Sequence, residues 1–337
     1  MKIGILTLPL QDNYGGLLQN FALQKALLQM GHDVTTIDYM KTPIPPLWRY
    51  IKSWIKTILL LCIGKRRKFI KYTHVGTRNP QNEKFVSLHI NKTKTYFTYN
   101  TEILKQNEID TIIVGSDQVW RPKYNYRIEN AFLDFCKDQS NLKRIAYAAS
   151  FGVDEWEFTA WQTKKCAMLA KKFDAISVRE ESGKALCNKY LEIEATTVLD
   201  PTLLLSKETY CELCKNVPIK KEKFLAAYVL DKNEATYKEC ESIAKESNLT
   251  LKFFEADTKA SLSVPEWLSM FRDASYVVTD SFHGTVFSII FGKKFKCLYN
   301  KSRGSARFES LLKIYESGRL DEMREFSLNW LKKVLEK

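Results

Sequence analysis

Val277-Val278-Thr279-Asp280-Ser281-Phe282-His283-Gly284-Thr285 is the most informative stretch of the chain, because an apolar run ends there in a polar turn that contains one of only four histidines. Residues 274–278 have the pattern of a buried strand, and residues 285–291 have that of a buried helix. His283 therefore falls at the carboxyl end of a strand, where open α/β sheets bind their ligands. The helix start adds unpaired N–H groups and a positive dipole end, which suit a phosphate or a carboxylate.

The same alternation continues toward the N-terminus. A strand at 3–8, a helix at 17–30 and a strand at 33–39 form a βαβ unit, whose short crossover implies parallel pairing. A helix is also expected at 156–172. Besides the strands at 3–8 and 33–39, four more are expected at 109–114, 144–149, 175–178 and 196–199. All six end in polar turns.

A polar, lysine-rich segment at about 206–223, expected to form a linker and an entry helix, precedes a second alternation. Its strands are expected at 224–230, 250–254, 274–278 and 294–299, and its helices at 234–247, 264–272, 285–291, 307–315 and 323–335. We therefore predict an α/β protein with two doubly wound, Rossmann-like domains that face a cleft. The domains are expected at 1–205, with a basic aromatic insertion near 45–95, and at 206–318, followed by a C-terminal helix at 319–337 that packs back on the first domain.

Composition places the chain among soluble globular proteins, since 45% of its 337 residues are hydrophobic and 27% are charged. The first residues lead into a strand pattern without a signal peptide, so a cytoplasmic location is expected. The eight cysteines are scattered, which favours reduced thiols over a disulfide framework. The Cys211/Cys214 pair has no second pair at zinc-ribbon spacing, so we expect two thiols on a helix face and no metal site.

The net charge of +13 calls for an anionic partner. Nucleic acid is not expected, because no zinc finger, RNP-like or basic-zipper pattern is present. One basic aromatic segment, Trp48–Lys68, has an apolar core at 58–63 that is too short to cross a bilayer. Its tryptophans, aliphatic residues and flanking cations suit an in-plane helix on anionic lipid. The alternative is a surface helix packed on its own domain.

The turn after the first strand contains Asn13, Gly15 and Gly16. Glycines there let a ligand approach the backbone, but the turn equally suits a tight strand-to-helix connection. The spacing matches neither the dinucleotide fingerprint nor the phosphate-binding P-loop, so NAD and Walker-type nucleotide binding are not supported.

Three charged residues follow buried strands in the first domain. Arg179 is placed to bind a carboxylate or phosphate in a bidentate manner, or to pair with neighbouring Glu180 or Glu181. Asp117 and Asp200 occupy equivalent strand ends, where each could act as a general base or simply cap the following turn.

His283 is the strongest candidate for chemistry. Ser281, Thr285 and the helix-start amides surround it with donors for an anion, and a bound anion would favour its imidazolium form. Such a histidine suits general acid catalysis. Arg303 and Arg307 follow the next strand and could reach the same pocket. The other histidines are expected to be structural: His32, His74 and His89.

Together, the strand-end motifs resemble those of the polysaccharide pyruvyl transferase family over nearly the whole chain. The motifs are Ile5-Leu6-Thr7, Asn13-Tyr14-Gly15-Gly16-Leu17-Leu18-Gln19, Val114-Gly115-Ser116-Asp117-Gln118-Val119-Trp120, Tyr147-Ala148-Ala149-Ser150-Phe151-Gly152, Val178-Arg179-Glu180-Glu181-Ser182-Gly183, Leu199-Asp200-Pro201-Thr202-Leu203-Leu204 and Thr279-Asp280-Ser281-Phe282-His283-Gly284.

The resemblance implies a fold like that of the two-domain GT-B glycosyltransferases and transfer of the enolpyruvyl unit of phosphoenolpyruvate to a sugar. The product would be a pyruvate ketal, with phosphate released and no cofactor besides the donor substrate. The first domain would bind the acceptor and the second the phosphoenolpyruvate. His283 would be the general acid and Arg179 an anchor for phosphoenolpyruvate, while Asp117 or Asp200 would take the proton from the attacking hydroxyl.

One position departs from the family pattern. Some members have arginine two positions before the histidine, where this chain has Ser281, so Arg307, or else Arg303, is expected to supply the second cation. The family's acceptors are often lipid-linked oligosaccharides, which agrees with peripheral contact between the basic aromatic segment and the inner face of an anionic membrane. The alternatives are a GT-B glycosyltransferase that uses a nucleotide-sugar, or a non-catalytic carbohydrate-binding relative.

Overall fold

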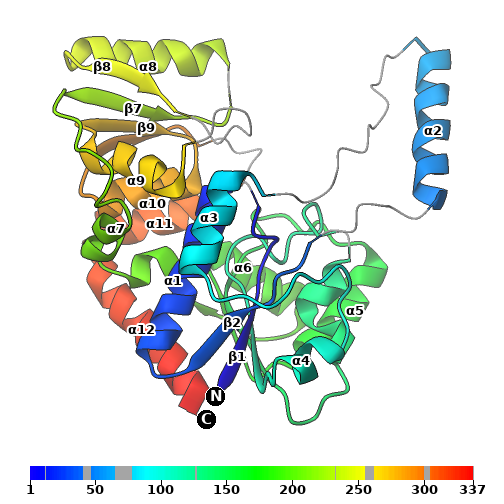
Figure 1. Cartoon of the computed structure of the whole chain (residues 1–337). Helices are drawn as coiled ribbons and strands as arrows, with labels where there is room; N and C mark the ends of the chain where they lie inside the picture. The colour runs from blue at the N-terminus through cyan, green and yellow to red at the C-terminus, as the bar shows by residue number, and fades with distance from the viewer. Residues whose placement is uncertain are drawn as a thin grey trace.

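Two parallel β-sheets, each flanked by helices, form the protein in the computed structural model (Figure 1). The structure describes residues 1–11, 13–40, 47–64, 78–125, 127–231, 233–254, 262–299 and 304–336. The prediction of two Rossmann-like domains that face a cleft is confirmed by the strand pairing, because every pair in both sheets is parallel.

The first sheet has six strands in the order β2-β1-β3-β4-β5-β6. Its four inner strands are short runs that are mostly buried on both faces, as parallel strands between helical layers require, whereas the edge strands β2 and β6 are polar and partly exposed. The six strands are β1 (Lys2–Leu6), β2 (Asp33–Thr36), β3 (Thr111–Val114), β4 (Lys143–Ala149), β5 (Ala175–Val178) and β6 (Thr196–Thr197). The helices of this part are α1 (Tyr14–Gln29), α2 (Leu47–Cys62), α3 (Pro80–His89), α4 (Glu102–Gln106), α5 (Ala160–Ala170) and α6 (Glu181–Leu186).

The second sheet has four strands in the order β10-β9-β7-β8. They are β7 (Phe224–Tyr228), β8 (Thr250–Phe253), β9 (Tyr276–Thr279) and β10 (Lys294–Cys297). Its helices, and the two that complete the chain, are α7 (Lys207–Leu213), α8 (Glu234–Glu246), α9 (Val264–Asp273), α10 (Phe282–Ile290), α11 (Ala306–Glu316) and α12 (Leu320–Glu336).

Several helices begin elsewhere than the sequence predicts, and for α5 and α10 a capping side chain decides the start. The expected helix at 156–172 begins only at Ala160, because Thr159 and Gln162 form a reciprocal capping box. The expected helix at 285–291 begins three residues earlier, at Phe282, because the Ser281 side chain accepts a hydrogen bond from the Gly284 amide. His283 therefore lies in the first turn of α10 rather than before it.

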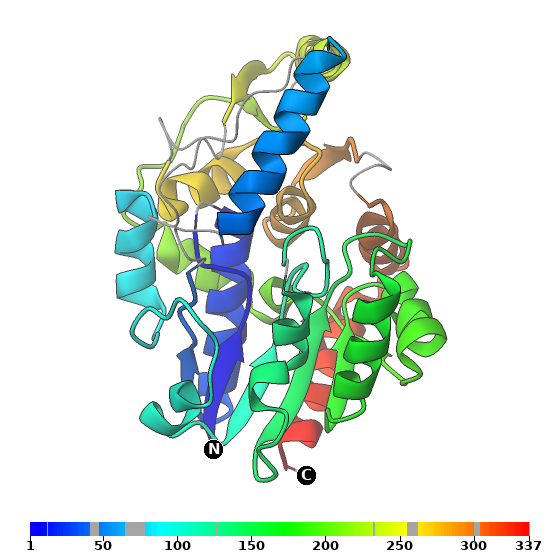
Figure 2. The ribbon, with the colours of Figure 1, turned by 90° about the vertical axis from the view of Figure 1, so that its right-hand side faces the viewer.

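Helix α1 connects the two domains and is buried on most of its surface. Tyr14, its first residue, stacks on Trp267 of α9 with ring centroids 5.4 Å apart, and its hydroxyl donates to the Leu262 carbonyl. Helix α12 returns to the first domain, where Lys143 donates to the Leu335 carbonyl at 2.8 Å. Figure 2 shows α12 beside the strands of the first sheet.

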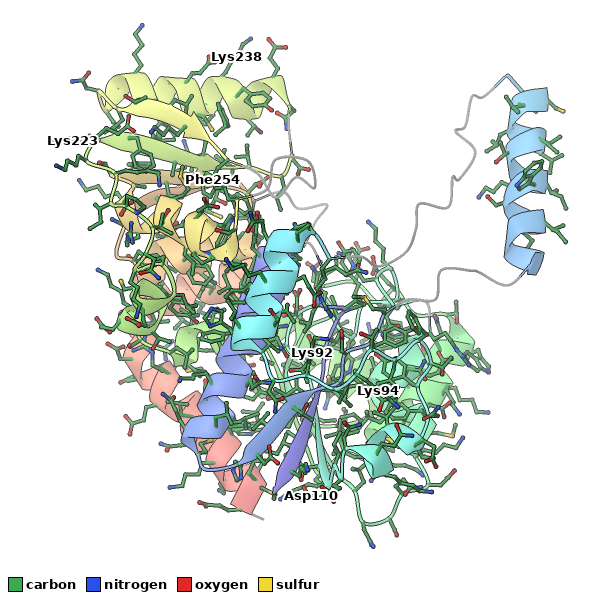
Figure 3. All side chains as sticks on the ribbon, viewed as in Figure 1. Lys92, Lys94, Asp110, Lys223, Lys238 and Phe254 are labelled. Atoms are coloured by element: carbon green, nitrogen blue, oxygen red, sulfur yellow. The ribbon has the colours of Figure 1, made fainter. Side chains whose placement is uncertain are left out.

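Lysines of the described residues lie in both domains. Lys223 and Lys238 project from the outer surface of the second domain, while Lys92 and Lys94 lie in the first (Figure 3). Among the helices that the structure describes, none has an apolar stretch long enough to span a bilayer.

Candidate active site

A cleft of about 500 Å³ separates the two domains where the carboxyl ends of both sheets meet. The first domain contributes the segments after β1 and β3, and the second contributes those after β7 and β9 and the start of α11. The lining residues are Leu8, Asn13, Asp117, Gln118, Arg121, Lys123, Tyr124, Tyr228, Leu230, Asp280, Ser281, Phe282, His283, Arg307 and Phe308.

His283 lies in the wall of this cleft and is held from two sides. Its Nε2 atom is 3.7 Å from Asp200 Oδ2, which lies behind it in the first domain. Gly15 packs against the other side of the ring, so closely that a Cβ atom at this position would lie 2.0 Å from His283 Nδ1. The position of the His283 imidazole, in the second domain, therefore requires a glycine at position 15 of the first domain.

Asp200 supports His283 and does not line the cleft. Its Oδ1 atom accepts hydrogen bonds from the Thr202 amide at 3.0 Å and the Thr202 hydroxyl at 2.6 Å. Burial would raise the pKa of this carboxyl, but the neighbouring His283, Arg179 and Thr202 outweigh it and hold the pKa well below its usual range. The resulting carboxylate faces Nε2 of the His283 imidazole from the first domain.

Arg179 is buried beneath the cleft, contrary to the prediction that it anchors a substrate. Its guanidinium pairs with Asp200 at 2.8 Å and with Asp117 at 3.3 Å, and its Nε lies 3.9 Å from Glu180. Its Cζ is 4.3 Å from the ring centroid of Phe282. The sequence left a salt bridge with a neighbouring glutamate as the alternative, but the two closest partners are the aspartates at the other strand ends.

The two candidate bases have different positions. Asp117 lines the cleft, whereas Asp200 is shielded from it and contacts the side chains of Arg179, Thr202, His283 and Ser116. Asp117 also has a left-handed backbone with φ of 69°, at the turn that follows β3. Of the two, Asp117 is the one that lines the cleft, so its position suits direct acceptance of a proton from a bound molecule, whereas Asp200 lies behind His283; a catalytic base at either position stays a prediction.

Arg307, the predicted second cation, is brought to the cleft by the start of α11. Burial, together with the charge of Arg179, lowers the pKa of Arg307 to about 10, which leaves it cationic at neutral pH. Its Cζ is 5.7 Å from the ring centroid of Phe282. Arg303, the alternative cation, lies outside the described residues.

The small polar residues predicted around His283 have separate roles. Ser281 lines the cleft while it caps α10. Thr285 is predicted to face the cleft, but it does not line it. Its hydroxyl donates to the Ser281 carbonyl at 3.2 Å and contacts Cys297 Sγ at 3.3 Å. Asn13 lines the cleft, whereas Gly15 and Gly16 do not; Gly15 instead makes room for His283.

Sequence reasoning missed the loop that follows Asp117. Gln118, Arg121, Lys123 and Tyr124 line the same cleft. Arg121 is held by a bidentate pair with Glu157, at 2.9 and 3.0 Å. These residues follow a strand-end motif directly. Since strand-end loops of parallel sheets meet at one edge, their position in the sequence already indicated that they could line the cleft.

The chemistry of the cleft is that of an anion site beside a proton donor. Lys123 and Arg307 supply positive charge, while the charge of Arg121 is balanced by Glu157; Asp117 and Asp280 also line the cleft, and the first turn of α10 lies at its wall. Across the ranges that the structure describes, no group of three or more histidine, cysteine or acidic side chains could hold a metal ion.

A comparison with protein families matches residues 13–302 to the model named polysaccharide pyruvyl transferase. This chain belongs to that family. The match extends from Asn13 through both domains and includes His283, Asp117 and Asp200. Membership makes the protein an enzyme of polysaccharide modification. No curated protein matches the chain in sequence at a significant level.

Three solved structures resemble the chain at low identity. The UDP-GlcNAc 2-epimerase of Neisseria meningitidis, bound to UDP-GlcNAc, is 10% identical, with a TM-score of 0.47 over 99% of both chains. The UDP-GlcNAc 2-epimerase of Methanocaldococcus jannaschii is 11% identical, with a TM-score of 0.47 over 96% of this chain and 94% of that one. The wall teichoic acid polymerase TagF is 10% identical, with a TM-score of 0.44 over 100% of this chain and 83% of that one.

The contact between Gly15 and His283 leads to a test that uses the neighbouring glycine as its control. We expect Gly15→Ala to lower turnover by about 100-fold, because the new methyl group must displace the imidazole and misplacement of a catalytic group by about 1 Å has an effect of this size. Gly16→Ala should change turnover little, since a Cβ there lies 3.4 Å from the Asn13 side chain. Steady-state kinetics of both variants, with thermal unfolding as a check on folding, make the comparison; equal effects would contradict the proposed contact.

Proposed function

We propose that the protein transfers the enolpyruvyl unit of phosphoenolpyruvate to a sugar of a cell-surface polysaccharide, or of its lipid-linked precursor, and forms a pyruvate ketal with release of phosphate. The observation that supports this most directly is the position of His283. His283 can donate a proton, and the Asp200 carboxylate lies behind it. The cleft that it faces is also lined by Arg307 and Lys123. Phosphoenolpyruvate needs both, because it bears about three negative charges and must be protonated on carbon.

In the proposed reaction, His283 donates a proton to the methylene carbon of phosphoenolpyruvate. Positive charge then develops at C2, and a first sugar hydroxyl attacks there while Asp117 accepts its proton. A second hydroxyl of the same sugar displaces phosphate from C2 and closes the ketal; its proton returns to His283, and the proton held by Asp117 leaves with the phosphate. One phosphoenolpyruvate and two hydroxyls thus give one ketal and one phosphate, without a redox step.

The cations of the cleft have a separate role in this proposal. Arg307 and Lys123 hold the carboxylate and phosphate groups and neutralise the phosphate as it leaves. Arg179 acts from below: it pairs with Asp200 and Asp117 and holds both carboxyl groups in position, and it does not contact the substrate. We propose phosphoenolpyruvate as the donor substrate and no bound cofactor.

A turnover assay tests the proposal. The purified protein is incubated with phosphoenolpyruvate and a panel of lipid-linked sugars, and phosphate release and the mass of the acceptor are measured. We expect phosphate release that depends on the acceptor, together with the mass increase of one pyruvate ketal. Turnover of a nucleotide-sugar alone would instead indicate a glycosyltransferase, and sugar binding without turnover of either donor would indicate a non-catalytic relative.

A further inference from the structure

Helix α2 (Leu47–Cys62) exposes an unusually large apolar surface. Several large apolar side chains of this helix and of the turn that follows it are each about half exposed or more. They are Ile51, Trp54, Ile55, Ile58, Leu59, Leu61 and Ile63, with exposed fractions from 46% to 66%. A soluble monomer rarely exposes so many contiguous apolar side chains unless they mark a binding surface.

Most of the apolar residues of α2 lie on one face, whereas Leu60 lies on the opposite side. Ile51, Ile55 and Ile58 follow one another at intervals of four and three residues, so they lie one above another along the helix. Lys52 and Lys56 are spaced by one turn and lie at the border of this face, and Ser53 lies on the opposite side. The helix is therefore amphipathic, with an apolar face flanked by cations.

This face does not pack on the protein's own core. In Figure 1, α2 stands apart from both sheets and from the helices that cover them, and in Figure 3 its side chains extend from it on several sides. The expectation that the segment packs as a surface helix on its own domain is therefore not met by the arrangement in the structure. Residues 65–68 of the basic aromatic segment lie outside the described residues.

The apolar face of α2 could be covered by a lipid surface or by a second copy of the protein, and the charge of the surrounding sequence favours the lipid surface. The sequence from Lys41 to Lys71 contains no aspartate or glutamate, and its cations are Lys41, Arg49, Lys52, Lys56, Lys65, Arg66, Arg67, Lys68 and Lys71. Two α2 helices packed face to face would bring these like charges together, whereas anionic lipid headgroups would neutralise them.

We propose that α2 is a membrane-docking helix that lies in the plane of an anionic lipid surface. Ile51, Ile55 and Ile58 enter the boundary between headgroups and acyl chains, and Lys52 and Lys56 bind the headgroups. The helix follows β2, at the carboxyl edge of the first sheet, which is also the edge that forms the cleft. Docking through α2 thus brings the cleft to the membrane surface, where a lipid-linked acceptor resides; this last step alone rests on the proposed function.

Sedimentation with vesicles tests the proposal on the full chain. Vesicles of phosphatidylcholine with phosphatidylglycerol are compared with vesicles of phosphatidylcholine alone, without phosphoenolpyruvate or acceptor. We expect binding to the anionic vesicles that weakens with added salt. Ile58→Asp should lower the partition coefficient on the order of fiftyfold, because it removes a large apolar group from the membrane and adds a repelled charge.

Ser53→Asp is the matched control, since it adds the same charge on the opposite face; its effect should be about fivefold. Equal binding by Ile58→Asp and the unchanged protein would overturn the proposal. The proposal would also be overturned if sedimentation equilibrium shows a self-association of the protein that Ile58→Asp abolishes while vesicle binding persists. Because no substrate is present, these outcomes do not depend on the proposed reaction, and turnover of a water-soluble acceptor should be equal in both variants.

Discussion

Replacing His283 with glutamine is expected to lower turnover by about 10²- to 10⁴-fold, the usual contribution of a positioned general acid. Glutamine fills much of the space between Gly15 and Asp200 but cannot release a proton to carbon at neutral pH. The Asp200 carboxylate then no longer faces a group that it can stabilise as a cation. The loss should appear in kcat as well as in kcat/KM, because the proton is transferred in the chemical step.

The turnover of His283→Gln is measured as phosphate release from phosphoenolpyruvate in the presence of acceptor. His32→Gln is the control, because this histidine follows the end of α1 and does not line the cleft. The control should keep full turnover. A His283→Gln protein that unfolds at the usual temperature and turns over at the original rate would refute the general acid role, while leaving the fold and the family assignment intact.

Replacing Arg179 with leucine is expected to lower the free energy of unfolding by about 3–5 kcal/mol, the usual cost of removing one partner of a buried ion pair. Asp200 and Asp117 would keep their charges inside the protein without the guanidinium that now pairs with both. Glu180 lies beside them, and burial already raises the pKa of its carboxyl. The loss comes from uncompensated buried charge rather than from lost packing.

Urea unfolding at neutral pH measures the change, with Arg127→Leu as the matched control. Arg127 pairs with Glu129 at 3.4 Å, but its side chain is 62% exposed. The Arg127 cation is largely in solvent, although the Glu129 side chain is only 11% exposed, so losing this pair should cost much less than losing Arg179. Equal, small losses for both variants would show that Arg179 does not hold the carboxylates together. Turnover of Arg179→Leu under folding conditions should also fall, because Asp200 would lose its position behind His283.

Much of the fold follows from local pattern. Apolar runs such as residues 111–114 and 175–178 are too short and too uniformly apolar for surface helices, and the helices between them impose parallel pairing. The capping side chains of Thr159 and Ser281 moved two helix starts, which is a matter of single hydrogen bonds rather than of hydrophobic period. The strand-end position of His283 likewise follows from the sequence, because the carboxyl ends of parallel strands meet at one edge.

The sequence by itself determined the two Rossmann-like sheets, the family, the place of His283 and the amphipathic character of α2. Only the tertiary structure decided that Arg179 faces inward, that Asp200 stands behind the imidazole while Asp117 faces the cleft, and that Gly15 of one domain seats a histidine of the other. The physical reason is that hydrophobic period and capping act over a few residues, whereas ion pairs and close packing across a cleft depend on groups far apart in the chain.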